Sequence, residues 1–330
     1  MQYFVAPENY IRKSTQNRQH IDPKNLCTWG IDYLDKHFGG GIAPRSFNLI
    51  ACESGRGKTT LVSNMAVENS LRGKKVAFIR LEGDMYDFAD TEKWKIIYDE
   101  VYKMFRDEEL PNLPDYQSYR LNNIPGIESL EQDAQKHLLT RLKNVFLFDK
   151  GTHRSLSRDT ITDVLNNMKD VFDLIIIDHL HYFEITDERQ QYREQMESVK
   201  IINDFVDSVG TPVVLVSHVR KRDSRASKQL LKMEDIQGSS DIFKIAHTVL
   251  MMSPYYEEYD DIEKIYPTLF YSPKSRYGAS TTAIGIKCFD GKSKKYISGY
   301  EQAKHVFYKG EWKIERETDR PKKYAANNFF

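Results

Sequence analysis

The segment with the clearest chemistry is a glycine-rich run, CESGRGKT, which begins at Cys52. It matches the phosphate-loop pattern G-x-x-x-x-G-K-[ST] except that Cys52 replaces the first glycine. Gly55 and Gly57 allow the backbone to curl, so that its amides face an anion at a helix N-terminus. Lys58 would supply a positive charge to the terminal phosphates, and the Thr59 hydroxyl would be a ligand for Mg²⁺.

We expect this loop to bind a nucleotide through a continuous set of residues. The set is Ser54, Gly55, Arg56, Gly57, Lys58, Thr59 and Thr60. The alternative is a glycine-rich surface turn beside a lysine, but a strand before the loop and a helix after it favour the phosphate site. Cys52 is expected to be a small packing residue rather than a thiol nucleophile.

Carboxylates at strand ends would complete such a site. The run FDLIIID ends at Asp178, as in a Walker B element, where a buried strand holds a carboxylate near Mg²⁺ and its waters. Hydrolysis also needs a group that activates or orients water. We expect Glu82 in this role, because it ends the run KKVAFIRLE and adjacent parallel strands end at one sheet edge. Asp84 competes with it, and a salt bridge from Glu82 to Arg80 is the other interpretation.

These residues need a parallel α/β sheet to position them. Apolar runs predict buried strands at Phe47–Ala51, Lys75–Leu81, Val145–Phe148, Leu174–Ile177 and Pro212–Ser217. Later strands are predicted at Thr248–Met252 and Thr268–Ser272, followed by a closing β-hairpin of Thr281–Cys288 and Lys295–Ile297 turned around Asp290-Gly291. Helical spacing is found at Thr59–Leu71, Thr91–Phe105, Ile127–Leu142, Ile161–Val171 and Tyr192–Val209. Residues 84–142 are expected to form an insertion or a pair of helices beside the sheet.

The composition is that of an ordinary globular protein. Of 330 residues, 40% are hydrophobic, and 48 Lys+Arg balance 48 Asp+Glu. This balance argues against a basic surface over the whole chain. No apolar run approaches the ~18 residues of a membrane span, and the N-terminus lacks a secretory signal, so a cytoplasmic location is expected. The cysteines Cys27, Cys52 and Cys288 have no metal-ligand spacing.

The phosphate loop, Glu82 and the segment LIIIDHLHYF together resemble the RecA-like core of ring-forming replicative helicases, which include the DnaB-like bacterial family and the phage primase-helicases. The likeness runs from about Thr28 to Tyr296, and the lead-in GIDYLDKHFGGGIAPRS precedes the loop as in that family. The resemblance implies a RecA-like P-loop NTPase fold, ATP or another NTP with Mg²⁺, a hexameric ring, and 5′→3′ translocation on single-stranded DNA.

The resemblance also assigns roles to three later residues. In VVLVSHV it places His218 where the family has a polar sensor of the γ-phosphate. The segment SPKSRYG matches the family's Lys-x-Arg element, which enters the neighbouring subunit's nucleotide site, so Arg276 would be an arginine finger and Lys274 its companion. The alternatives are a strand-end histidine with only a structural role and a solvated basic turn. His179 and His181 receive no role.

Two loops of this family face the DNA channel, and here they would be residues 186–194 and 221–241. Arg220–Lys232 holds six basic residues against one acidic, which favours contact with a phosphate backbone over the alternative of a solvated loop. The following IQGSSD matches the family's DNA-contacting segment. The expected DNA-binding residues are Arg189, Arg225, Lys228, Gln237, Gly238 and Ser239.

The expected domain organisation has three parts. Residues 1–25 would be an arm that links to a neighbouring subunit, residues 26–300 the RecA-like ATPase domain, and residues 301–330 a C-terminal extension and tail. Because no primase-like segment precedes the core, we expect a separate primase and other replisome proteins as partners. Two other functions stay open: a RecA-like recombinase filament, and a non-translocating regulatory scaffold of the clock-ATPase type.

Overall fold

The computed structural model describes most of the chain. The described residues are 6–19, 21–83, 85–104, 113–148, 157–180, 191–219, 231–236, 242–254, 264–277, 281–300, 303–308 and 311–316. Among the helices of these segments, none combines the length and the apolar composition that a membrane crossing requires.

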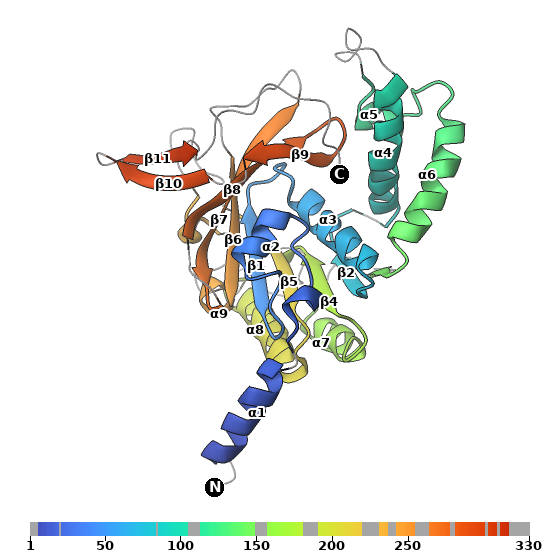
Figure 1. The fold of residues 1–330 in the computed structure, drawn as a ribbon. Helices are drawn as coiled ribbons and strands as arrows, with labels where there is room; N and C mark the ends of the chain where they lie inside the picture. The colour runs from blue at the N-terminus through green and yellow to red at the C-terminus, as the bar shows by residue number, and fades with distance from the viewer. Residues whose placement is uncertain are drawn as a thin grey trace.

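A nine-stranded open sheet forms the centre of the molecule, in the order β3-β2-β4-β5-β1-β6-β7-β8-β9 (Figure 1). The first six strands in this order are parallel, and the last three continue the sheet as an antiparallel meander. The strands are β1 (Phe47–Cys52), β2 (Val76–Arg80), β3 (Val145–Leu147), β4 (Leu174–Asp178), β5 (Val213–His218), β6 (Thr248–Pro254), β7 (Ile265–Ser275), β8 (Thr281–Asp290) and β9 (Lys295–Tyr300). The predicted mostly parallel sheet with a hairpin at its end is therefore confirmed.

Both faces of the parallel strands are buried, as their uninterrupted apolar sequences require. In β1, Leu49 and Ala51 belong to one core cluster, while Ile50 and Cys52 belong to another, because successive side chains point to opposite faces. The first cluster includes residues of α7 (Arg158–Asn167), α8 (Gln191–Val209) and α9 (Ile242–Ile245). The second includes residues of α2 (Asp32–His37) and α3 (Lys58–Leu71). The sheet is thus held rigidly between two helical layers.

The region between β2 and β3 forms a helical insertion with its own small core. It comprises α4 (Met85–Met104), α5 (Tyr116–Arg120) and α6 (Glu128–Arg141) and packs around Trp94. The Trp94 indole N–H donates to the Lys292 carbonyl at 2.8 Å, and the Lys295 ammonium contacts the Asp99 carboxylate at 2.5 Å. These contacts fasten the insertion to the turn between β8 and β9, beside the phosphate loop (Figure 1).

Several predicted boundaries were wrong. Helix α4 begins at Met85, six residues before the predicted Thr91. Helix α7 covers Arg158–Asn167 rather than Ile161–Val171; the Ser157 hydroxyl accepts from the Thr160 amide at its start, and Asp170 beyond its end has a positive φ of 59°. The later strands β7, β8 and β9 are all longer than predicted.

Further elements of the described residues lie where no helix or strand was predicted: α2, α5, α9, and a two-stranded antiparallel ribbon of β10 (Ala303–Tyr308) and β11 (Glu311–Arg316). At the other end of the chain, helix α1 (Pro7–Gln19) projects away from the body, followed by the short 3₁₀ helix η1 (Pro23–Asn25) (Figure 1). A second 3₁₀ turn, η6 (Met233–Asp235), lies between β5 and β6.

Candidate active site

The phosphate loop connects the carboxyl end of β1 to the N-terminus of α3. Gly55 and Gly57 have φ values of 75° and 85°, which only glycine adopts without strain, and Gly57 is the N-cap of α3. The first amides of α3 therefore face the loop, where a helix N-terminus can bind an anion, and anion binding by this loop stays a prediction. The buried Lys58 donates to the Glu53 carbonyl at 2.8 Å, and burial lowers the pKa of its ammonium.

The surroundings of the loop account for two of its residues, the cysteine at position 52 and the glycine at position 57. Cys52 is fully buried, and burial raises the pKa of its thiol to about 12, so the side chain is neutral and serves for packing. Tyr296 of β9 donates its hydroxyl to the Gly57 carbonyl at 2.9 Å. A Cβ at Gly57 would lie 2.6 Å from that hydroxyl oxygen, so only glycine fits beneath Tyr296.

Asp178 ends β4, two strands away from β1, and is 1% exposed. Burial raises the pKa of Asp178 to about 6, while the Thr59 hydroxyl and the cations of Arg80 and Lys58 oppose this rise. Within the part of the chain that the structure describes, the Asp178 carboxylate has no hydrogen-bond partner other than the adjacent Thr59 hydroxyl. A buried carboxylate in this condition fits a Mg²⁺ ion bound directly or through water, with the Thr59 hydroxyl as the other predicted ligand.

Glu82, His179 and His218 converge beside Asp178. Glu82 follows β2, His179 follows β4 and His218 ends β5, and these strands are neighbours in the sheet. The Glu82 carboxylate lies 3.1 Å from Nε2 of His179, and Nε2 of His218 lies 2.9 Å from that same nitrogen. The structure thus brings the predicted base and the predicted sensor into one cluster. His179, which carried no role in the sequence analysis, joins them.

Lys274 and Arg276 lie elsewhere. Strand β7 runs antiparallel to β6, and Ser275 is paired with Thr248 at the amino end of the parallel strands. The Lys274 ammonium donates to the carbonyls of Phe243 and Lys244 at 2.6 and 2.7 Å. Arg276 is exposed and donates to the Lys244 carbonyl at 3.1 Å. Both residues are therefore at the sheet edge opposite their own phosphate loop.

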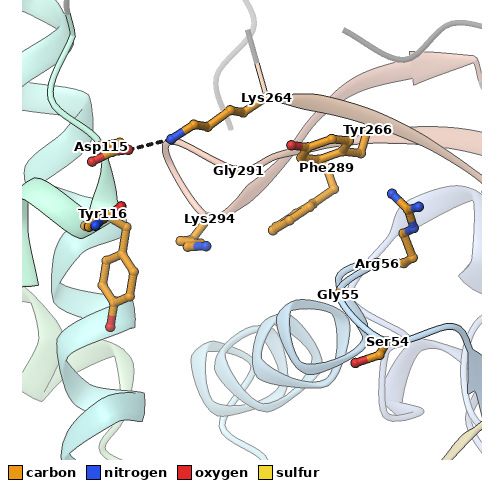
Figure 2. Close-up of a pocket in the computed structure, with 11 residues that line it drawn as sticks. Ser54, Gly55, Arg56, Asp115, Tyr116, Lys264, Tyr266, Phe289, Gly291 and Lys294 are labelled. Carbon is orange, nitrogen blue, oxygen red and sulfur yellow. Dashed lines mark hydrogen bonds and ion pairs between the residues drawn. The ribbon is translucent and has the colours of Figure 1, made fainter. Parts of the chain in front are cut away.

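A pocket of about 530 Å³ adjoins the phosphate loop on its outer side. Figure 2 shows Arg56 of the loop on one side, Tyr116 of α5 on the other, and Phe289 and Lys294 between them. The Lys264 ammonium, which contacts Asp115 at 2.6 Å, borders the same space. This mixture of aromatic and cationic groups suits the base and sugar of a nucleotide. Apart from the loop residues, sequence analysis missed this pocket, because its walls come from distant segments.

Some predicted site residues lie outside the described residues. These are Asp84, the competitor of Glu82, and the whole expected DNA-binding set of Arg189, Arg225, Lys228, Gln237, Gly238 and Ser239. Thr60, the last predicted nucleotide-binding residue, is buried in the first turn of α3.

A family model described as "AAA domain" matches residues 14–224, which contain the phosphate loop, Glu82, Asp178 and His218. The chain belongs to the AAA domain family. Members of this family are P-loop ATPases, and the chain is accordingly an ATP-hydrolysing P-loop NTPase that uses a nucleotide.

Solved structures with a similar fold include a DnaB-like replicative helicase studied with primase, at a TM-score of 0.67 and 15% identity, over 89% of this chain and 67% of that one. The ATPase domain of G40P gives a TM-score of 0.68 and 14% identity over 89% and 99% of the two chains. A KaiC-like protein from Pyrococcus horikoshii gives a TM-score of 0.53 and 13% identity, over 84% of this chain and 99% of that one. At these identities the likeness establishes the RecA-like fold that the sequence predicts.

A local sequence match exists to the DNA repair protein RadA of Mycobacterium tuberculosis, 40% identical over 53 residues. It covers 16% of this chain and only 11% of that protein.

Proposed function

We propose that this ATPase is a replicative DNA helicase that works as a ring and translocates on single-stranded DNA. The observation that carries the proposal is the position of Lys274 and Arg276, which lie on the sheet edge opposite the phosphate loop of their own chain. At about 3.3 Å per residue, the six residues of β1 separate the two edges by roughly 16 Å. No arginine side chain spans that distance, so Arg276 could act as an arginine finger only in the nucleotide site of a neighbouring chain.

A head-to-tail arrangement of subunits would present Arg276 of one chain to the phosphate loop of the next. Repeated heterologous contacts of this kind generate closed rings when the rotation closes. The six-fold stoichiometry and the 5′→3′ direction rest on the resemblance to DnaB-like helicases. The fold similarity to a DnaB-like replicative helicase over 89% of the chain supports the helicase proposal.

We propose that His179 and His218 couple ATP hydrolysis to the DNA-binding loops. His218 precedes the basic stretch Arg220–Lys232 by two residues, and His179 precedes the other proposed DNA loop, residues 186–194, by seven. Movement of either histidine on loss of the γ-phosphate would therefore shift the start of a DNA-binding loop. Arg225, Lys228 and Gln237 are our proposed contacts to the DNA backbone, together with Arg189, Gly238 and Ser239.

Helix α1 is proposed to dock on the neighbouring subunit. It has 13 residues, it projects from the body, and its Tyr10 and Ile11 side chains are 55% and 57% exposed (Figure 1). A helix of this length is only marginally stable alone in water, so a packing partner for its apolar residues would stabilise it.

A forked duplex with single-stranded tails tests the proposed activity. ATP-dependent strand separation, with a requirement for the 5′ tail, is the expected result. Strand separation that needs only the 3′ tail would contradict the assigned direction.

The shared active site is tested by mixing two inactive chains. Arg276→Ala and Glu82→Ala should each abolish hydrolysis while nucleotide affinity is kept. Mixed oligomers should regain activity, because some interfaces combine an intact Glu82 from one chain with an intact Arg276 from the next. If mixtures that exchange subunits stay inactive, Arg276 does not act in the neighbouring site.

The recombinase alternative has support of its own from the local match to RadA and from the fold similarity to RadB recombinase, at a TM-score of 0.50 and 16% identity. Electron microscopy with a non-hydrolysable ATP analogue separates the two functions. Closed rings are expected, and long helical filaments on DNA would favour the recombinase.

A further inference from the structure

We propose that Glu82, His179 and His218 form a binding site for a divalent transition-metal cation such as Zn²⁺, distinct from the Mg²⁺ site at Thr59 and Asp178. One ligand atom from each residue lies within 4.8 Å of the other two. A cation held at this point would engage the groups that we assign to water activation and γ-phosphate sensing. We infer that it inhibits ATP hydrolysis, and this second step rests on the proposed function.

The distances fit metal coordination. When bonds of about 2.1 Å meet at tetrahedral angles, neighbouring donor atoms lie about 3.4 Å apart. The Glu82 oxygen and Nε2 of His179 are separated by 3.1 Å and the two Nε2 atoms by 2.9 Å, so shifts of about half an ångström would bring these atoms to the spacing of a shared ion.

The two contacts also share one atom. Both Glu82 and His218 approach Nε2 of His179, and a neutral imidazole nitrogen carries either one proton or one lone pair. A relay of hydrogen bonds would use both nitrogens of the central ring, one for each neighbour. Two contacts to a single nitrogen are instead compatible with one cation shared by the three ligand atoms.

The ligand types determine the class of metal. Two imidazole nitrogens and one carboxylate suit Zn²⁺, Co²⁺ or Ni²⁺, whereas Mg²⁺ prefers oxygen ligands alone. The His179 side chain is 4% exposed and that of Glu82 is 54% exposed, so the site is buried at His179 and open to solvent at Glu82. Three protein ligands with an open side leave a position for water or a phosphate oxygen. The cysteines do not compete, because all three are buried.

The binding test uses the full chain after removal of metals by a chelator, without nucleotide or DNA. Zn²⁺ is titrated against a chromophoric zinc chelator, and Co²⁺ is added separately to record its visible absorption. We expect one Zn²⁺ per chain and a Co²⁺ spectrum typical of nitrogen and oxygen ligands. His179→Gln and His218→Gln should each weaken Zn²⁺ binding by about tenfold or more. His137→Gln, at an exposed position on α6, is the matched control and should bind Zn²⁺ like the parent chain.

Retained ADP affinity shows that each variant is folded. If the buried His179→Gln variant fails to fold, then the Zn²⁺ affinities of His218→Gln and of the exposed Glu82→Gln test the site. Absence of Zn²⁺ binding at micromolar free metal, or unchanged affinity in these variants, would overturn the site. Because this assay contains neither nucleotide nor DNA, its outcome is independent of the helicase proposal.

The inhibitory role is measured separately, with a large excess of Mg²⁺–ATP and a zinc buffer that fixes the free metal concentration. Hydrolysis by the parent chain should fall in step with Zn²⁺ occupancy, by at least about tenfold at saturation. Full activity of the Zn²⁺-loaded chain would overturn the inhibitory role.

Discussion

The contact between Tyr296 and the phosphate loop yields a graded prediction for two alanine substitutions. In Gly55→Ala the new methyl group meets no atom within 4 Å, so its cost is only the left-handed backbone, about 1 kcal/mol. In Gly57→Ala the same backbone cost applies, but the methyl group would also lie 2.6 Å from the Tyr296 hydroxyl oxygen and 3.2 Å from its Cζ. Displacing that ring adds about 1–3 kcal/mol for overpacking and for the lost hydrogen bond to the Gly57 carbonyl.

Urea unfolding should therefore show a loss of about 1 kcal/mol for Gly55→Ala and about 3 kcal/mol for Gly57→Ala. Affinity for a fluorescent ADP analogue should fall further in Gly57→Ala, by about tenfold, because the loop amides move with the displaced carbonyl. Adding Tyr296→Phe to Gly57→Ala removes the closest clashing atom and should recover part of the loss. Equal losses of stability in the two single variants would refute the argument that Tyr296 selects glycine at this position.

Three further substitutions follow from the site. Because the pKa of Asp178 is raised from 3.8 to about 6, the folded chain holds this proton more tightly than the unfolded chain, so stability without metal should fall by up to about 3 kcal/mol as the pH rises from 4 to 6. Asp178→Asn should remove this loss and stabilise the metal-free chain at pH 7 in thermal unfolding, while abolishing hydrolysis; unchanged pH dependence would contradict the assignment. Arg56→Ala should weaken ATP binding several-fold in a titration, since Arg56 borders the pocket with Phe289, whereas Lys136→Ala on the exposed side of α6 should not. Ile11→Asp should lower the oligomer fraction in sedimentation velocity without changing monomer stability, and an unaffected oligomer would exclude docking through this face of α1.

Sequence analysis located the central strands and the phosphate loop well, because a continuous apolar run or a glycine-rich motif marks each of them within a few residues. The run FDLIIID has few ways to be buried other than as a strand between two helical layers, and β4 ends at Asp178 as expected. Helix α3 begins at Lys58, within one residue of the predicted start, since the glycines before it terminate the loop. Helix α5 escaped notice because it has only five residues, although the Asp115 carboxylate accepts from the Ser118 amide and marks its start. Such a short helix has no periodicity to detect.

The parts of the site that were missed depend on how distant segments pair. His179 meets His218 only because β4 and β5 are neighbours in a register that sets Ile177 opposite Leu215, and no local sequence pattern gives this register. A histidine immediately after the strand-end Asp178 was nevertheless a usable signal. The pocket beside Arg56 joins the insertion to strands about 150 residues further along the chain, as the Lys264–Asp115 contact shows, so spacing alone could not reveal it.

The most direct test of the central claim is the rate of ATP hydrolysis with and without single-stranded DNA. At low salt, a DNA-translocating ATPase should hydrolyse ATP several-fold faster when DNA is present, and the stimulation should decline steeply with added salt, because the proposed contacts are to phosphates. Arg225→Ala combined with Lys228→Ala should reduce the stimulation while leaving hydrolysis without DNA unchanged. A rate that does not respond to single-stranded DNA at low salt would contradict the helicase function and favour the regulatory scaffold.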